Sequence, residues 1–182
     1  MSTVNIDTFV PKKDHVFILD TNVLIKIFYP MDSSSKGAPY IDLYSKICKL
    51  HSVIIVSSVQ ISEFINRCIR FQFELWKYES QNMSADFKKD YRETKNYRES
   101  MNAILDIVKS DIMSNSTYIC DNFDKMNFDN LYQYGFSYDF NDSLIAEIAR
   151  INNATLITDD RDFANYHSNI TIVTGNRALL MF

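Results

Sequence analysis

The sequence predicts an α/β fold in which a parallel β-sheet carries helices on both faces. Short β-branched apolar segments alternate along the chain with longer segments whose apolar residues recur at helical spacing. The 182 residues are 46% hydrophobic, which suffices for one well-buried domain spanning residues 1–182. Glycine and proline number three each, and this scarcity disfavours long linkers and repetitive all-β folds.

Four segments have the composition of strands. They are short, rich in Val and Ile, and apolar on both faces, as strands buried beneath two helical layers are. The predicted strands are "VFIL" (16–19), "SVIIVSS" (52–58), "ATLIT" (154–158) and "ITIVT" (170–174).

Helices are predicted between these strands, at 22–29, 41–50, 57–78, 87–112 and 140–153. The third begins with a capping box, because Ser57 is followed three residues later by Gln60. Val59, Phe64, Cys68, Phe71, Leu75 and Tyr78 would form its apolar stripe. We expect this helix and the next to form a long helical hairpin, within an insertion at about 66–135. The loop 31–40 and the polar, aromatic region 114–135 show no clear periodicity.

Composition and charge make several classes of protein less favoured. The formal charge of −4 and pI of about 5.3 are atypical of a nucleic-acid-binding domain. Three dispersed cysteines without metal-ligand spacing indicate reduced thiols. We expect no signal peptide in the first fourteen residues and no membrane span, because no apolar run approaches about 18 residues. We therefore expect a soluble cytoplasmic protein without a membrane partner.

Acidic residues follow the predicted strands, where ligands of parallel sheets bind. Asp20 ends the first strand, Glu63 lies in the helix after the second, and Asp160 and Asp162 follow the third. Asp142 stands in the first turn of the preceding helix, and the strand rule does not place it. Each acid alone has an ordinary explanation as a helix cap, a dipole partner or a solvated side chain.

Gathered together, these carboxylates would repel one another, and a divalent cation would relieve that repulsion. An all-oxygen ligand set without Cys or His favours Mg²⁺ or Mn²⁺ over zinc. Such an ion polarises a phosphoryl group and lowers the pKa of its water, so the pattern favours phosphodiester hydrolysis.

Four short motifs, in order over residues 16–163, resemble those of the PIN-domain nucleases, the family of the VapC-type toxins. The matching pieces are "FILDTNVLI", "VSSVQISEF", "NDSLIAEIAR" and "LITDDRDF". The resemblance implies that Asp20, Glu63, Asp142 and Asp160 are catalytic metal ligands, with Asp162 a further ligand. It also implies supporting roles for Thr21, Asn22 and Thr158.

The resemblance further implies a three-layer α/β/α sandwich around a parallel sheet of four to five strands. The implied activity is metal-dependent cleavage of RNA, in the manner of an endoribonuclease. A toxin role would add an antitoxin or other protein partner, and we expect a homo-oligomer. The insertion at about 66–135 matches none of the motifs and departs from the shorter VapC-type toxins.

Contacts with RNA need cations, and the segment 86–100 supplies some. Lys88, Arg92 and Lys95 share one predicted helix face, and Arg161 lies between two of the acids. The same segment also fits an ordinary solvated face, because Lys95 can pair with Glu99 one turn later.

Two other functions remain as alternatives to the nuclease. An aspartyl-phosphate enzyme with Asp20 as nucleophile would carry a second Asp where Asn22 stands. A non-catalytic PIN-fold scaffold for RNA or protein would have lost one of the four metal acids, and all four are present.

Overall fold

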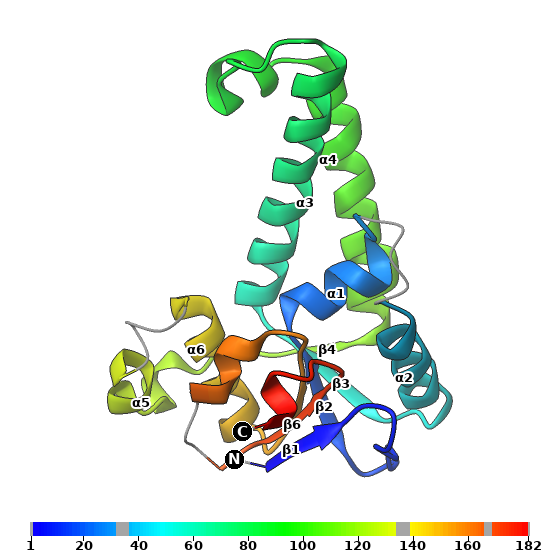
Figure 1. Ribbon diagram of the computed structural model, residues 1–182, viewed down its shortest axis with the longest axis vertical. Helices are drawn as coiled ribbons and strands as arrows, with labels where there is room; N and C mark the ends of the chain where they lie inside the picture. The colour runs from blue at the N-terminus through cyan, green and yellow to red at the C-terminus, as the bar shows by residue number, and fades with distance from the viewer. Residues whose placement is uncertain (1, 32–36, 134–138, 166–168, 182) are drawn as a thin grey trace.

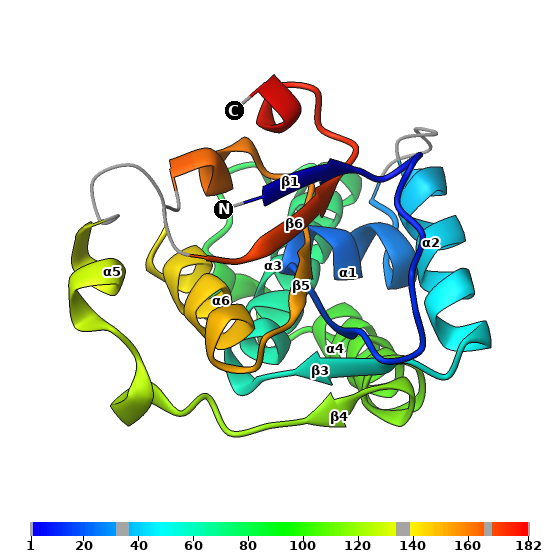
Figure 2. The ribbon, with the colours of Figure 1, turned by 90° about the horizontal axis from the view of Figure 1, so that it is seen from below.

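The computed structural model describes residues 2–31, 37–133, 139–165 and 169–181. In it a six-stranded, all-parallel sheet runs in the order β1-β6-β5-β2-β3-β4, which confirms the predicted parallel sheet between helices (Figure 2). The strands are β1 (Ser2–Asn5), β2 (Val16–Leu19), β3 (Val53–Val56), β4 (Thr117–Tyr118), β5 (Thr155–Ile157) and β6 (Thr171–Thr174).

The sheet has six strands rather than four to five, because two edge strands carry too weak a sequence pattern to be recognised. β1 pairs with β6 in the register Ser2↔Thr171. β4 has only two residues, both exposed, and pairs with β3 in the register Ile55↔Thr117. Edge strands of this kind are not apolar on both faces, which is the pattern that identifies the central strands in the sequence.

The helices follow the predicted positions closely. The α-helices are α1 (Thr21–Phe28), α2 (Ala38–Lys49), α3 (Ser58–Glu79), α4 (Lys95–Ile107), α5 (Phe128–Gln133) and α6 (Phe140–Ile151). The shorter helices are η2 (Phe87–Tyr91), η3 (Val108–Ile112), η4 (Met113–Asn115), η5 (Phe123–Lys125), η6 (Arg161–Asn165) and η7 (Leu179–Met181).

Alternate residues of each strand feed two separate cores. In β2, Phe17 and Leu19 pack with α1 to α4, whereas Ile18 packs with α5 and α6 on the other face. Leu156 and Ile157 of β5 divide in the same way. The sheet is therefore buried on both faces, which is why its strands read as continuous apolar runs.

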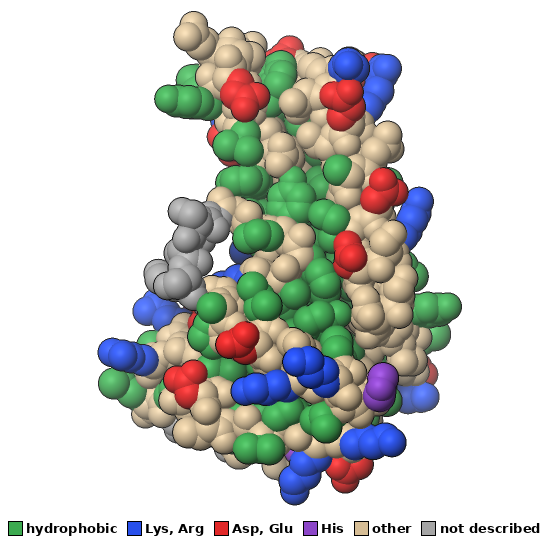
Figure 3. Space-filling model, turned by 90° about the vertical axis from the view of Figure 1, so that its right-hand side faces the viewer, with side chains coloured by type: hydrophobic (Ala, Val, Ile, Leu, Met, Phe, Trp, Pro, Cys, Tyr) green, Lys and Arg blue, Asp and Glu red, His purple; other side chains and the backbone are tan. Residues whose placement is uncertain are grey.

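The expected hairpin is present, and α3 and α4 project together from the sheet (Figure 1). Hydrophobic side chains line the middle of this projection (Figure 3). At its outer end the rings of Phe73, Trp76, Phe87, Tyr91 and Tyr97 contact one another.

The second long helix, predicted as one element at 87–112, is interrupted. The π-helical η2 ends at Tyr91, and α4 begins after Thr94, whose Oγ1 accepts a hydrogen bond from the Tyr97 N–H at 3.1 Å. Thr94 thus acts as an N-cap that restarts the helix. The stripe predicted for α3 is wrong in its outer half, because Leu75 and Tyr78 are exposed and Phe73 is buried.

Two predicted segments lie partly outside the described residues: positions 32–36 of the loop 31–40, and positions 134–135 of the insertion. The end of that loop is helical instead, because α2 already begins at Ala38. Within the described ranges, the region 114–135 consists of short helices, loops and β4, close to its prediction. No helix in these ranges is long and apolar enough to cross a membrane.

Candidate metal centre at the carboxyl edge of the sheet

Asp20 is held rigidly at the end of the central strand β2. Its N–H donates to the Ile157 carbonyl of the neighbouring strand β5 at 2.9 Å. Its side chain, only 3% exposed, makes no helix-capping hydrogen bond, although Asp20 occupies the N-cap position of α1. Instead Oδ2 accepts a hydrogen bond from Thr158 Oγ1 at 2.6 Å. Helix capping therefore does not account for this buried acid.

Glu63 is brought to the same edge from α3. Its Oε2 accepts a hydrogen bond from Thr21 Oγ1 at 2.9 Å, and its Oε1 lies 3.5 Å from Arg67 Nη1. Thr21 is fully buried directly after Asp20, so this bond links the two acid-bearing segments. The ordinary explanation of Glu63 as a solvated helix residue therefore does not hold.

Gln60 sets the position of α3 relative to β2. Its Oε1 accepts a hydrogen bond from the Ser57 N–H at 2.9 Å, as the capping box predicts, and its Nε2 donates to the Leu19 carbonyl at 2.5 Å. Gln60 is fully buried. One side chain thus joins the start of the helix that carries Glu63 to the strand end that carries Asp20.

Asp160 reaches the edge through the turn after β5. Its N–H donates to Thr158 Oγ1 at 2.9 Å, so this hydroxyl bridges the Asp160 backbone and the Asp20 carboxylate. Its Oδ1 accepts a hydrogen bond from the Asp162 N–H at 3.0 Å, a turn-forming contact at the start of η6. Asp160 therefore shapes the turn, and its charge raises the pKa values of Asp20 and Asp142.

Asp142, which the strand rule left unplaced, lies with the other three. Burial, followed by the charges of Asp20, Asp160 and Glu63, raises its pKa to about 8. Asp139 caps α6 instead, through the Asn141 N–H at 3.1 Å. Only packing of α6 against the sheet brings Asp142 to this edge.

The charges of the cluster are poorly compensated. The pKa of Asp20 is raised to about 7, mainly by burial. The hydrogen bond from Thr158 lowers this pKa, whereas the charges of Glu63 and Asp160 raise it further. In addition, the fully buried Ser143 Oγ beside Asp142 has no hydrogen-bond partner in the described part of the chain. Such an all-oxygen, negatively charged site fits a hard divalent cation in its chemistry.

The four carboxylates fit a divalent cation in their chemistry and their charge, but they do not form a coordination sphere. Among the residues that the structure describes, no three His, Cys, Asp or Glu side chains are placed closely enough to hold a metal ion. The four carboxylates act on one another electrostatically, and binding an ion would require them to move closer together.

The remaining residues singled out in the sequence are more dispersed. Asp162 lies beside Arg161, with 3.8 Å between its Oδ1 and the arginine Nε, and both side chains are substantially exposed. The Asn22 Oδ1 accepts a hydrogen bond from the Asp159 N–H at 3.4 Å, at the margin of the cluster.

The cations of the predicted RNA-binding face lie at the outer end of the hairpin, away from the acids (Figure 1). Lys95 pairs with Glu99 at 3.2 Å, and the Arg92 guanidinium lies 5.3 Å from the centre of the Phe87 ring. Lys88 belongs to the same η2 segment. Their role in RNA binding stays a prediction.

Sequence reasoning missed a polar network beside Asp160. Asp159 forms an ion pair with Lys26 and accepts a hydrogen bond from Tyr40 Oη at 2.7 Å. The Asn176 Nδ2 donates to the Asp159 carbonyl at 2.7 Å. These contacts stabilise the turn after β5 that carries Asp160. No local motif could have predicted the network, because its residues come from four separate segments.

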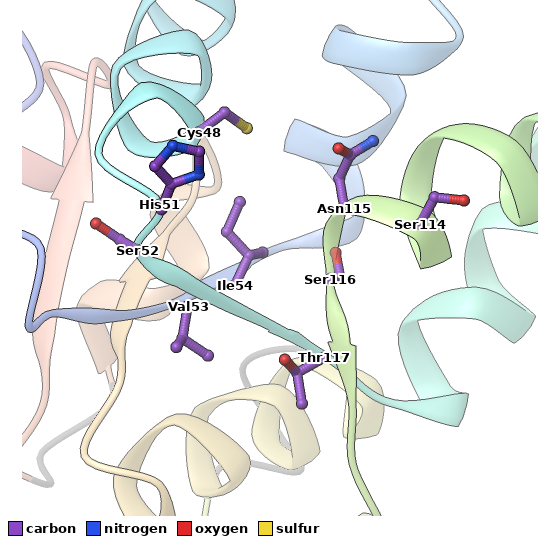
Figure 4. A pocket seen from close by; sticks show the side chains of 9 residues that line it. All are labelled: Cys48, His51, Ser52, Val53, Ile54, Ser114, Asn115, Ser116 and Thr117. Atoms are coloured by element: carbon purple, nitrogen blue, oxygen red, sulfur yellow. The ribbon is translucent and has the colours of Figure 1, made fainter.

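A pocket of about 370 Å³ lies at the opposite edge of the sheet, where β3 and β4 begin (Figure 4). It is lined by Cys48, His51, Ser52, Val53, Ile54, Ser114, Asn115, Ser116 and Thr117. It contains no carboxylate, so the acids at the carboxyl edge form a separate site.

A family model described as "PIN domain" matches residues 17–169. The chain belongs to the PIN domain family. Members of this family are typically nucleases that use divalent metal ions. The matched range contains all four clustered acids and the whole projecting hairpin, whereas β1 precedes it.

Two solved structures share the PIN fold of this chain. VapBC2 from Rickettsia felis, bound to a DNA fragment from its promoter, has a TM-score of 0.52 at 21% identity, covering 87% of this chain and 98% of its own. FitAcB from Neisseria gonorrhoeae has a TM-score of 0.51 at 14% identity, covering 86% and 96%. At these identities the likeness concerns the fold alone. No curated protein was found to match the sequence.

Proposed function

We propose that this PIN-domain protein is a metal-dependent endoribonuclease that hydrolyses RNA phosphodiester bonds. The observation that carries the proposal is the gathering of Asp20, Glu63, Asp142 and Asp160 at one sheet edge, with the pKa values of Asp20 and Asp142 raised to about 7 and 8. Strongly perturbed pKa values cluster at functional sites, where burial and like charges are brought together.

We assign the four carboxylates as the ligands of Mg²⁺ or Mn²⁺. When bound, such an ion would polarise the scissile phosphate and lower the pKa of a water molecule. The surrounding residues orient the carboxylates: Thr158 Oγ1 holds Asp20 and the Asp160 backbone, and Thr21 Oγ1 holds Glu63. Asp162 would be a further ligand of the ion, and the exposed Arg161 beside it would contact the RNA backbone.

A toxin role and a protein antitoxin are part of this proposal. They are supported by the structural neighbours VapBC2 and FitAcB, which are toxin–antitoxin complexes. The cytoplasm, where RNA and a protein partner would be encountered, is the expected compartment.

The decisive experiment measures cleavage of labelled single-stranded RNA, with and without Mn²⁺ or Mg²⁺, by the wild-type protein and by Asp20→Asn. We expect metal-dependent cleavage that falls at least a hundredfold in the variant, because Asp20→Asn removes a ligand charge and preserves side-chain volume. Asp106→Asn, on the exposed side of α4, is the matched control and should retain full activity. Undiminished cleavage by Asp20→Asn would rule out the mechanism.

Binding of Mn²⁺ should be measured in the same samples. Metal binding without cleavage of any RNA would favour a binding scaffold. Absence of metal binding would indicate that the four acids have structural roles only.

A further inference from the structure

Four exposed aromatic side chains form a continuous row on the α5 side of the molecule. The ring centres of Phe123 and Phe128 are 5.3 Å apart, those of Phe128 and Tyr132 are 6.2 Å apart, and those of Tyr132 and Phe140 are 6.5 Å apart. The exposed fractions of these residues are 46%, 43%, 62% and 43% in chain order. We refer to these four residues as the aromatic row.

The rings of the aromatic row share a common orientation over most of its length. The planes of Phe128 and Tyr132 differ by 18°, and those of Tyr132 and Phe140 by 23°. Each ring stays more than two-fifths exposed although it contacts its neighbours, so the aromatic row presents contiguous aromatic surface to solvent. Contiguous exposed apolar surface marks interaction sites in proteins.

The aromatic row ends on the helix that carries Asp142. Phe140 is the first residue of α6, and Asp142 stands in the same first turn. The helices α5 and α6 lie side by side in two perpendicular views (Figures 1 and 2). The last ring of the row and one acid of the cluster therefore belong to the same helical turn.

Charge alone does not explain how an acidic protein would hold RNA. The formal net charge is −4, and Asp124, Asp129 and Asp139 flank the aromatic row, with Lys125 the cation within η5. Of the hairpin cations predicted to bind RNA, Lys95 and Arg92 are engaged with Glu99 and Phe87. Base stacking on aromatic rings requires no net positive charge and is tolerant of sequence, because every base has a π-face.

We propose that the aromatic row is a stacking platform for the unpaired bases of a single-stranded RNA, which it leads to the acid cluster. This inference rests on the proposed function, since it names the form of RNA that the same centre would cleave. The bases stack on the rings, and the phosphates, held by few cations, contribute little to affinity.

The test measures binding of a labelled single-stranded RNA by fluorescence anisotropy in the Asp20→Asn background, where cleavage does not interfere. We expect Tyr132→Ala and Phe128→Ala each to weaken binding about tenfold, the effect of losing one base–ring stack. Tyr132→Phe keeps the ring and should bind as tightly as the parent. Tyr78→Ala removes an aromatic ring that is 78% exposed on the hairpin, and should leave affinity unchanged.

Two further measurements separate stacking from phosphate contacts. A duplex of the same sequence should bind at least about tenfold more weakly, because its bases are already stacked on one another. The slope of log affinity against log salt should be shallower than about −1.5, corresponding to about two phosphate contacts.

Equal affinity of Tyr132→Ala and the parent would overturn the proposal and leave the aromatic row as a surface for a protein partner. Equal binding of duplex RNA, or a slope as steep as about −3, would overturn it as well. If the wild-type protein cleaves no RNA but the ring variants still weaken binding, the nuclease proposal fails and the platform stands. Metal-dependent cleavage with unchanged binding in the ring variants would overturn the platform alone.

Discussion

At the scale of single residues, folding buries acids of the cluster, and burial disfavours their ionised form. Asp20 and Asp142 have their pKa values raised from 3.8 to about 7 and about 8, mainly by burial and then by neighbouring carboxylates. Between pH 4 and pH 8 the folded protein therefore binds more protons than the unfolded chain. Its free energy of unfolding, without metal, must fall as pH rises across that window.

We predict that Asp142→Asn reduces this pH dependence in metal-free protein. The variant removes one carboxyl with a raised pKa, so its thermal midpoint should exceed that of the wild type at pH 8, by about 2–4 °C for each 1 kcal/mol gained. At pH 4 the carboxyl of Asp142 in the folded protein is protonated and as neutral as the Asn amide. The thermal midpoints of the two proteins should therefore agree there. Thermal unfolding in EDTA from pH 4 to pH 8 provides the measurement, and parallel curves for the two proteins would contradict the assignment.

At the scale of elements, the site depends on how two strand ends and one helix start are joined. Gln60 accepts from the Ser57 N–H and donates to the Leu19 carbonyl, and it is fully buried. Loss of one partner of a buried hydrogen bond leaves the other unsatisfied, which costs more than the bond itself contributes. The junction of β3 and α3 is therefore a single structural unit with the end of β2.

We predict that Gln60→Leu lowers the free energy of unfolding by about 2–3 kcal/mol, because two buried backbone groups lose their partners. Urea unfolding measures the loss. Asn66→Leu, at an exposed position of the same helix, should change stability by less than about 0.5 kcal/mol. A comparable loss in both variants would show that Gln60 has no special joining role.

At the scale of the whole molecule, the rings around Tyr91 pack on the outer half of α3, whereas Glu63 lies near the start of that helix. Tyr91 is fully buried and packs on the rings of Phe73, Trp76, Phe87 and Tyr97. The acids depend instead on β2, β5, α3 and α6. Perturbing the outer hairpin should therefore spare the metal centre.

We predict that Tyr91→Ala loosens the outer hairpin, at a cost of about 3–5 kcal/mol to its local stability, as loss of a large buried ring does. Hydrogen exchange should accelerate in the segments around Phe73 and Tyr97. Mn²⁺ affinity should stay within about twofold of wild type. A large loss of Mn²⁺ affinity would mean that the hairpin supports the site directly.

The sequence by itself determined the parallel sheet, the helix order and the acids at the strand ends. These features are local, because a buried strand reads as an apolar run and Asp20 directly follows one. The capping box at Ser57 and Gln60 is local in the same sense. The edge strands β1 and β4 were not predicted, because they have only four and two residues, which are partly or fully exposed and show no clear apolar pattern.

Only the tertiary structure decided the rest. Packing of α6 on the sheet brought Asp142 to Asp20, and contacts across distant segments joined Lys26, Tyr40 and Asp159. Tertiary packing also left Leu75 and Tyr78 exposed while it buried Phe73, and it aligned four dispersed aromatic residues into one row. The physical reason is that periodicity reports which residues prefer burial, whereas the partner of each side chain depends on how the elements pack.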